Sequence, residues 1–300
     1  MILKKKTVIK IVSGIVVATM VAMVGISVNV GFKLTSPKRQ AIQETPDAHG
    51  LKYEDVTFKS FDDIKLKGWW IESSQEGSNK TVIFSHGYRQ NRVMHDIKAL
   101  NLAKTLHDRG YNVLMFDFRA SGESGGEICT IGQNEKKDLL SAIKFAKEER
   151  KSQEIDLIGW SMGAAVSILG GSESKDVNKI IADSPFSDLR DYLEVNLPVW
   201  TELPSVPFNS MILAILPNLR GMDPKGVSPR ESAENLDKEM LLIHSTKDDK
   251  IPYTESLKIK DHIKRKNLVT VWITDNKGHK DTYKYMPKEY EKRILNFLES

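Results

Sequence analysis

One serine in this chain stands where a turn could expose its hydroxyl as a nucleophile. Ser161 is the centre of Gly159-Trp160-Ser161-Met162-Gly163. Residues 155–158 before this motif are apolar, as in a short buried strand, and residues 164–169 after it are typical of a packed helix. A serine at such a strand-to-helix corner can attack a carbonyl carbon. The glycines let the backbones approach closely, and the new helix points its free N–H groups at the attacked group.

A second serine matches the same five-residue pattern. Ser124 is the centre of Gly122-Glu123-Ser124-Gly125-Gly126, which follows a strand-like segment at residues 111–117. Residues 118–121 separate that segment from the motif, and no helical period follows it. The pattern alone is weak, since it occurs by chance in about one chain in ten of this length and composition. We therefore interpret Ser124 as a loop residue and Ser161 as the candidate nucleophile.

A serine hydroxyl needs a base to remove its proton and a carboxylate to orient that base. When the nucleophile lies at a strand-to-helix corner, the acid and then the histidine follow later in the chain. His279 comes just after the last expected strand, and Asp248 just after the preceding one. The adjacent Asp249 remains an alternative acid, because a pattern does not separate neighbouring carboxylates. Asp183, at the end of another strand, is a more distant option.

The other histidines have structural or surface interpretations. His244 lies on an apolar strand and His86 beside a glycine, and the remaining four are expected on the surface: His49, His95, His107 and His262. No histidine–carboxylate cluster has metal-ligand spacing, so we expect no metal and no other cofactor. Cys129 is the only cysteine, which excludes an intramolecular disulfide, and we interpret it as a buried, inert residue.

The elements that would position these residues alternate between strands and helices. Residues 53–59 and 64–71 alternate like an antiparallel pair of strands. Further strands are expected at residues 81–84, 111–116, 155–158, 179–182, 240–244 and 268–273, and helices at residues 96–106, 136–149, 256–264 and 283–298. This order predicts an α/β fold with a mostly parallel, eight-stranded sheet and helices on both faces.

Two segments interrupt the alternation. Residues 118–132 are a glycine-rich loop, and residues 184–227 are an insertion before Ser228-Pro229-Arg230-Glu231, which is typical of a capped helix start. Within the insertion, residues 208–216 are apolar on almost every side. We therefore expect a small helical lid at about residues 185–227.

These motifs resemble those of the α/β-hydrolase superfamily, particularly its serine aminopeptidase and lysophospholipase-like branch, over about residues 51–300. The chain is also similar to bacterial members that carry an N-terminal membrane segment. The family's His-Gly pair after the third strand matches His86-Gly87-Tyr88. The resemblance implies five site residues: Ser161 as nucleophile, Asp248 as acid, His279 as base, and Tyr88 and Met162 as backbone donors of the oxyanion hole.

Two loops depart from the family's pattern. The usual Asp-x-Arg-Gly-x-Gly-x-Ser loop appears at residues 117–124 with Ala120 in place of its first glycine. The His-Gly-x-x-Asp of the acid loop has Ser245 in place of glycine. Neither change touches a catalytic atom, so the resemblance still implies activity. We expect Asp117 and Arg119 to brace their loop rather than contact substrate.

The combined motifs predict a serine hydrolase of the carboxylesterase or lipase type, which cleaves a carboxylic ester through an acyl-enzyme intermediate. The expected substrate is a small-molecule ester, lipid-like if the apolar insertion lines the acyl pocket. Peptidase, thioesterase and acyltransferase activities remain open, because they share the triad. A non-catalytic, membrane-anchored binding module is the alternative of a different class, although such modules usually lose a triad residue.

The charge of the chain is concentrated at its N-terminus. The formal net charge is +4, and the four lysines before the apolar segment, Lys4, Lys5, Lys6 and Lys10, account for it. The rest of the chain is electrically balanced, which argues against binding to nucleic acid.

The N-terminal segment is long enough to span a membrane. Residues 11–32 carry no charged side chain, and as a helix they extend about 30 Å, the thickness of a hydrocarbon core. A cleaved signal peptide is the alternative, with a poor cleavage site at Gly25-Ile26-Ser27. The basic tail most simply stays in the cytoplasm, which predicts a single-pass cell-membrane protein with an extracytoplasmic catalytic domain. We expect three parts: an anchor at residues 1–34, a tether at 35–50 and a hydrolase domain at 51–300.

Overall fold

One mixed sheet runs through the molecule, which is described here by a computed structural model of residues 5–300. Its strand order is β1-β2-β4-β3-β5-β6-β7-β8. The strands are β1 (Glu54–Lys59), β2 (Lys65–Ile71), β3 (Lys80–Ser85), β4 (Asn112–Phe116), β5 (Glu154–Trp160), β6 (Lys179–Asp183), β7 (Glu239–Lys247) and β8 (Val269–Lys277). Strand β2 pairs antiparallel with β1 and β4, and all other neighbours pair in parallel. The predicted eight-stranded, mostly parallel sheet is confirmed.

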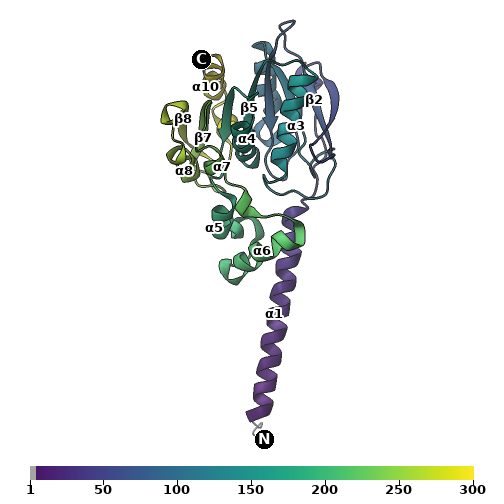
Figure 1. The fold of residues 1–300 in the computed structure, drawn as a ribbon, viewed down its shortest axis with the longest axis vertical. Coiled ribbons are helices and arrows are strands. Elements are labelled where there is room, and N and C mark those ends of the chain that lie inside the picture. Colours follow the sequence, from purple (N-terminus) through teal and green to yellow (C-terminus); the bar gives the residue numbers. More distant parts are fainter. Residues whose placement is uncertain (1–4) are drawn as a thin grey trace.

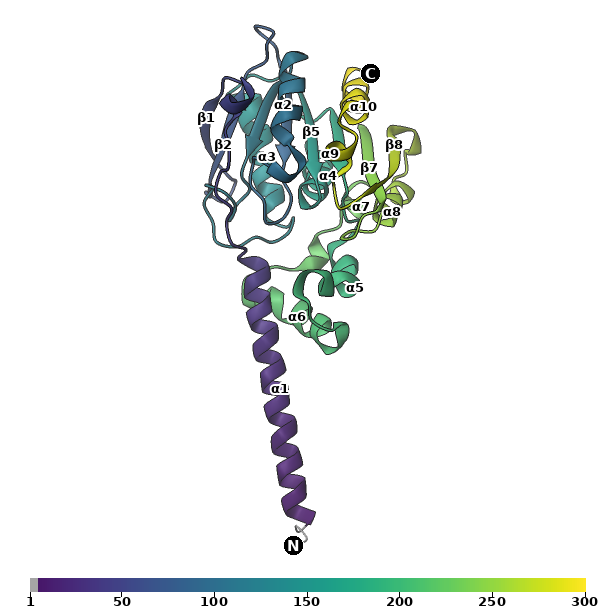
Figure 2. The same cartoon turned by 180° about the vertical axis from the view of Figure 1, so that it is seen from behind.

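Helices cover both faces of the sheet (Figures 1 and 2). On one face, α3 (Glu135–Glu148), α4 (Met162–Glu173) and α8 (Thr254–His262) bury their apolar sides in one core cluster. On the other face, α2 (Ala99–Asp108) and α10 (Pro287–Glu299) pack in a second cluster. The central strands are buried on both faces, which explains their continuous apolar sequences.

The last predicted helix, at residues 283–298, is wrong in one respect. The structure has two helices there, α9 (Thr282–Tyr285) and α10, separated at Met286. Pro287 has no N–H to donate to the preceding turn and keeps the residue before it out of helical geometry. Met286 accordingly has φ −130° and ψ 50°.

Strands β7 and β8 continue beyond their apolar runs, which ended the predicted strands at residues 244 and 273. Pairing extends through a register shift to Lys247 opposite Lys277. This extension brings the loop after β7 and the loop after β8 to the same end of the sheet. The loops carry Asp248 and His279, so strand pairing holds the candidate acid and base near each other.

The insertion forms a helical lid. It contains α5 (Leu189–Thr201) and α6 (Ser205–Arg220), whose axes differ by 113°. Both helices bury side chains in a third cluster, separate from the two clusters on the sheet faces. The short helix α7 (Pro229–Ser232) follows the insertion. Figures 1 and 2 show the lid at the end of the domain from which the N-terminal helix leaves.

The N-terminal helix α1 (Lys5–Thr35) projects from the domain (Figure 1). Its length and mean hydropathy of 2.4 in the most apolar window are sufficient to cross a membrane, and 6% of that window is buried. Its last turns pack against α6. The polar segment that follows lies on the domain, where the Arg39 guanidinium donates to loop carbonyls, among them that of Gly126 at 2.6 Å.

Candidate active site

Ser161 lies on a sharp turn between β5 and α4. Its backbone has φ 56° and ψ −120°, a conformation that L-residues rarely adopt and that is common at functional sites. The flanking glycines permit this turn. A Cβ at Gly163 would collide with the backbone of Ser85 and lie 2.6 Å from the carbonyl oxygen of His86, and a Cβ at Gly159 would collide with Gly163. The predicted strand, turn and helix around Ser161 are therefore present.

The structure brings Ser161, His279 and Asp248 together. His279 Nε2 lies 2.7 Å from Ser161 Oγ, and His279 Nδ1 lies 2.7 Å from Asp248 Oδ2. A proton on Nδ1 would be donated to the carboxylate, which leaves Nε2 free to accept the serine proton. The arrangement can therefore generate a nucleophilic serine.

Asp248 is held by more than His279. Its Oδ1 accepts hydrogen bonds from the Lys250 and Ile251 amides, each at 2.9 Å, and its Oδ2 lies 3.3 Å from His244 Nε2. Burial opposes ionisation of the carboxyl. The hydrogen bonds from His244 and His279 outweigh burial and hold the pKa of Asp248 well below its usual value. Asp248 is therefore a carboxylate at neutral pH, as orientation of a histidine requires.

The alternative residues lie elsewhere. The side chain of Asp249 is 66% exposed and lies 3.8 Å from Lys250 Nζ. Asp183 is buried, accepts hydrogen bonds from Ser184 Oγ and Tyr290 Oη, and has a pKa raised by burial to about 6. Ser124 Oγ donates to the Asp117 carbonyl at 2.6 Å. In the described part of the chain, none of these three residues forms a hydrogen bond or an ion pair with His279.

The loop after β3 lies against the nucleophile. A Cβ at Gly87 would be 3.5 Å from Ser161 Cβ, so the following Tyr88 amide enters the neighbourhood of the reacting serine. Met162 is the first residue of α4, where amides have no partner within the helix. Within residues 5–300, neither amide donates to another protein atom. Both are available to stabilise an oxyanion.

His86 stabilises this loop in a neutral form. Burial lowers its pKa to about 4. Its Nδ1 lies 2.8 Å from the Gly87 carbonyl oxygen, and its Nε2 accepts a hydrogen bond from the Phe118 amide at 3.0 Å. The interpretation of His86 as a structural residue agrees with these contacts.

Asp117 and Arg119 brace the neighbouring loop, as predicted. Asp117 accepts hydrogen bonds from the Arg92 amide and guanidinium, both at 2.7 Å. The Arg119 guanidinium pairs with Asp138 at 2.6 Å. Ala120 has φ 55°, so it keeps the left-handed backbone that favours the family's glycine at this position.

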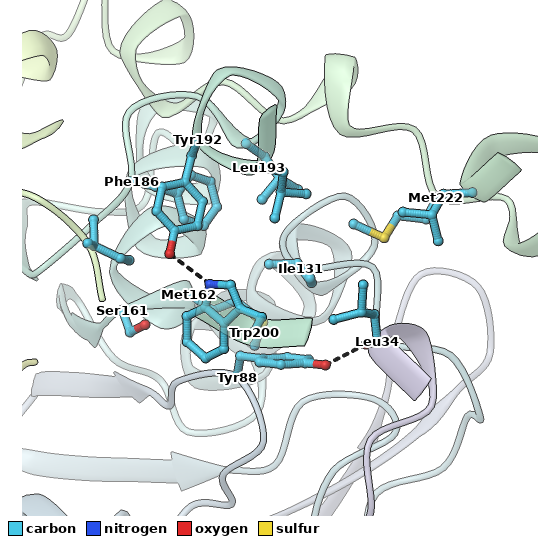
Figure 3. A pocket seen from close by; sticks show the side chains of 13 residues that line it. Leu34, Tyr88, Ile131, Ser161, Met162, Phe186, Tyr192, Leu193, Trp200 and Met222 are labelled. Atoms are coloured by element: carbon cyan, nitrogen blue, oxygen red, sulfur yellow. Dashed lines mark hydrogen bonds between the residues drawn. The ribbon is translucent and has the colours of Figure 1, made fainter. Parts of the chain in front are cut away.

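An apolar pocket begins at Ser161 and ends between the lid and α1 (Figure 3). It is narrow, with a cavity volume of about 30 Å³. Its lining is Ser161 with apolar and aromatic side chains from several elements: Leu34, Tyr88, Ile131, Met162, Phe186, Leu189, Tyr192, Leu193, Trp200, Leu216, Met222 and Ile251. No Asp, Glu, Lys or Arg belongs to this lining of described residues.

The lid is fastened to the acid loop beside the pocket. Trp200 Nε1 donates to Tyr192 Oη at 2.8 Å, and Tyr192 Oη donates to the Lys250 carbonyl at 3.0 Å. The Tyr88 and Trp200 rings make an edge contact with centroids 5.9 Å apart. Trp200 and Leu216 line the pocket, and Leu213 of the same lid is buried in the third cluster.

Two residues that support Asp248 and the segment before His279 were not predicted. His244 contacts Asp248 and also lies 2.7 Å from Ser256 Oγ, so its ring is fixed from both sides. Ser245 Oγ, near the end of β7, donates to the carbonyl of Asn276, near the end of β8 and ahead of the loop that carries His279. The replacement of the family's glycine by Ser245 was visible in the sequence, but its partner was not, because the ends of the two strands are far apart along the chain.

A cluster suitable for a metal ion is absent from the described residues 5–300.

The profile of one family, serine aminopeptidase S33, matches residues 77–232, more than half of the chain. The chain belongs to the α/β-hydrolase superfamily. This assignment agrees with the strand order, the turn at Ser161 and the lid between β6 and β7.

Two proteins are similar to this α/β hydrolase over most of its length, one by sequence and one by structure. Protein YqkD of Bacillus subtilis (strain 168), which is uncharacterized, is 28% identical over 272 residues, 86% of this chain and 85% of YqkD. The esterase Pf2001 of Pyrococcus furiosus is 32% identical with a TM-score of 0.73, and the comparison covers 88% of this chain and 98% of the esterase.

A peptidase has the same fold. The acylaminoacyl peptidase of Pyrococcus horikoshii is 20% identical with a TM-score of 0.64, covering 83% of this chain and 41% of the peptidase. At this identity the likeness concerns the fold alone. The family match and the likeness to the esterase make the chain a serine hydrolase of the α/β family.

Proposed function

We propose that this protein is a membrane-anchored carboxylesterase that acts on an ester with an apolar acyl group. The observation that carries this proposal is the apolar pocket that starts at Ser161 and contains no charged side chain among the described residues. Such a pocket gains affinity from each methylene that it removes from water. The esterase activity of the Pyrococcus furiosus relative supports the same reaction.

The proposed reaction proceeds through an acyl-enzyme. His279 Nε2 accepts the Ser161 proton as Oγ attacks the ester carbonyl, and the Tyr88 and Met162 amides donate to the oxyanion. His279 then gives the proton to the leaving alcohol. Water, deprotonated by His279, attacks the acyl-enzyme and releases the carboxylic acid and Ser161. Asp248 keeps Nδ1 protonated and stabilises the imidazolium that forms in both steps.

Aminopeptidase activity is the second candidate, because the matching family bears that description. An aminopeptidase must bind the free α-ammonium group of its substrate, which in a water-excluding pocket requires a carboxylate or other acceptors. The lining of the pocket at Ser161 contains no Asp or Glu side chain that could accept a hydrogen bond from this ammonium group. The composition of the lining therefore favours an uncharged acyl group.

Two esters with the same leaving group test this choice. We expect N-acetyl-leucine p-nitrophenyl ester to be hydrolysed with kcat/KM at least about 10²-fold above that of leucine p-nitrophenyl ester, because the ammonium group of the latter would be buried without a partner. The two substrates have the same scissile bond and the same side chain. Faster hydrolysis of the ester with the free ammonium group, together with turnover of leucine p-nitroanilide, would favour the peptidase instead.

The N-terminal helix supports a location at the cell membrane. We propose that α1 is an uncleaved anchor and that the catalytic domain lies outside the cytoplasm, because the four N-terminal lysines most simply remain inside. Alkaline carbonate should leave the full-length protein in the membrane pellet, and protease added to intact protoplasts should digest the catalytic domain. A soluble protein that begins near Val28 would indicate a cleaved signal peptide, and protection from protease would place the domain inside.

A further inference from the structure

The end of the apolar helix α1 forms part of the pocket. Leu34 is buried and lines the cavity together with Leu216 of the lid. The Tyr88 hydroxyl donates a 2.6 Å hydrogen bond to the Leu34 carbonyl (Figure 3). In the same view, Ser161 lies at one end of the group of side chains and Leu34 lies toward the other. The pocket thus connects the nucleophile with the proposed membrane anchor.

This end of α1 is fixed to the domain. The Cys129 amide donates to the Thr35 carbonyl at 2.8 Å, and Arg220 Nε donates to Thr35 Oγ1 at 2.8 Å. The Arg220 guanidinium also lies over the Phe32 ring, 4.6 Å from its centroid. These contacts come from a core loop and from the lid. The wall formed by Leu34 is therefore a built part of the pocket.

The lid extends along α1 into the depth of the apolar segment. Ser27, Gly31, Leu34 and Thr35 are buried on one side of α1. A Cβ at Gly31 would lie 3.5 Å from Leu216, which places α6 against this side. Lys33 is the first charged residue after Lys10. At a rise of 1.5 Å per residue, Ser27 lies about 9 Å from Lys33 along the helix axis, on the side of the apolar segment. The buried side of α1 reaches Ser27, so part of the lid lies at the level of the hydrocarbon.

The composition of the lid suits that position. Residues 195–219 contain a single charged side chain, Glu202, although 28% of the whole chain is charged. Two lid valines face outward, Val195 with 72% and Val206 with 84% of its surface exposed. Exposed apolar side chains on a segment with so little charge are favourable at a lipid interface and unfavourable in water.

We propose that the acyl chain of the substrate enters this pocket from the lipid leaflet, at the contact between α1 and α6. This inference rests on the proposed esterase function. The ester carbonyl lies at Ser161, and the acyl chain extends past Trp200 toward Leu34 and Leu216. The cavity volume of about 30 Å³ is smaller than an acyl chain, so these side chains must move apart as the chain enters. Hydrolysis releases a fatty acid and a single alcohol.

The first experiment uses full-length protein in vesicles of diether phosphatidylcholine, which has no ester to cleave. We expect kcat/KM for 1-decanoylglycerol to exceed that for 1-butyrylglycerol by at least about tenfold, since each buried methylene contributes up to about fourfold. More vesicle lipid at constant decanoylglycerol should lower the rate in proportion to the mole fraction of substrate in the membrane. A rate that follows only the bulk concentration would overturn entry from the membrane.

The second experiment changes the far end of the pocket. Leu34→Trp should lower the decanoyl-to-butyryl ratio at least about fivefold by shortening the space for the chain, and Leu34→Ala should shift the preference toward longer chains. Ile26→Trp is the control, because Ile26 is 41% exposed on the same helix away from the pocket. Fluorophosphonate labelling of each variant reports whether the Ser161 site has folded. An unchanged ratio in both labelled Leu34 variants would overturn the inference.

The two proposals fail in different ways. If the wild-type protein hydrolyses butyryl esters but shows no chain-length or surface-dilution effect, the entry of substrate from the membrane is wrong and the esterase function stands. If it hydrolyses no ester in any form, the proposed function is itself wrong.

Discussion

Ser161→Ala is expected to abolish fluorophosphonate labelling and to lower the turnover of p-nitrophenyl acetate by at least about 10³-fold. The alanine removes the Oγ that lies 2.7 Å from His279 Nε2, so no acyl-enzyme can form. A factor of 10³ corresponds to about 4 kcal/mol of lost transition-state stabilisation. Labelling of purified protein and steady-state kinetics measure the two effects.

Ser124→Ala is the matched control, because it changes the other serine in the same sequence pattern. Ser124 donates to the Asp117 carbonyl and accepts from the Lys67 amide at 2.9 Å, so its loss affects a loop and not the reacting atoms. We expect labelling and turnover to change little. Labelling that survives in Ser161→Ala and disappears in Ser124→Ala would refute the assignment of the nucleophile.

Asp248→Asn is expected to lower kcat by about 10²- to 10⁴-fold. The Lys250 and Ile251 amides donate to Oδ1, so an asparagine oxygen would keep that position and its NH₂ group would face His279. His279 Nδ1 would then become an acceptor, and the ring proton would move to Nε2. The histidine could no longer accept the serine proton. The pH dependence of kcat/KM and single-turnover acylation measure this loss.

Asp249→Asn is the control for the neighbouring carboxylate and should cost less than about tenfold. Its side chain is exposed and its nearest charged neighbour is Lys250 at 3.8 Å. The two variants have the same change in formal charge, so long-range electrostatic effects are similar. Equal losses in both would show that orientation by Asp248 is not what the base requires.

The parts of the site that the sequence predicted depend on short segments. The turn at Ser161 was predictable because a strand, two glycines and a helix are contiguous, and a Cβ at either glycine would collide with nearby backbone. The order of the strands along the chain placed Asp248 and His279 after β7 and β8. Neighbouring parallel strands end at the same edge of a sheet, so both residues had to lie near that edge.

The choice between adjacent residues depended on the tertiary structure. Asp248 and Asp249 are equivalent as sequence. Only the backbone path after Lys247 turns one carboxylate toward His279 and His244 and the other toward solvent. The break between the two final helices was likewise not predicted from the sequence. The apolar pattern of residues 283–298 continues across Met286 and therefore predicted one helix, where the structure has two.

The sequence by itself determined the fold class, the candidate nucleophile and the chemical types of its expected partners, because strand and helix patterns, glycine requirements and chain order are local properties. The tertiary structure decided the shape of the pocket at Ser161. Its lining comes from α1, the loops after β3 and β4, the turn at Ser161, the lid and the loop after β7. The first lining residue, Leu34, and the last, Ile251, are more than 200 residues apart in the sequence. The shape of this pocket depends on how distant segments pack together, so it cannot be predicted from any one segment of the sequence.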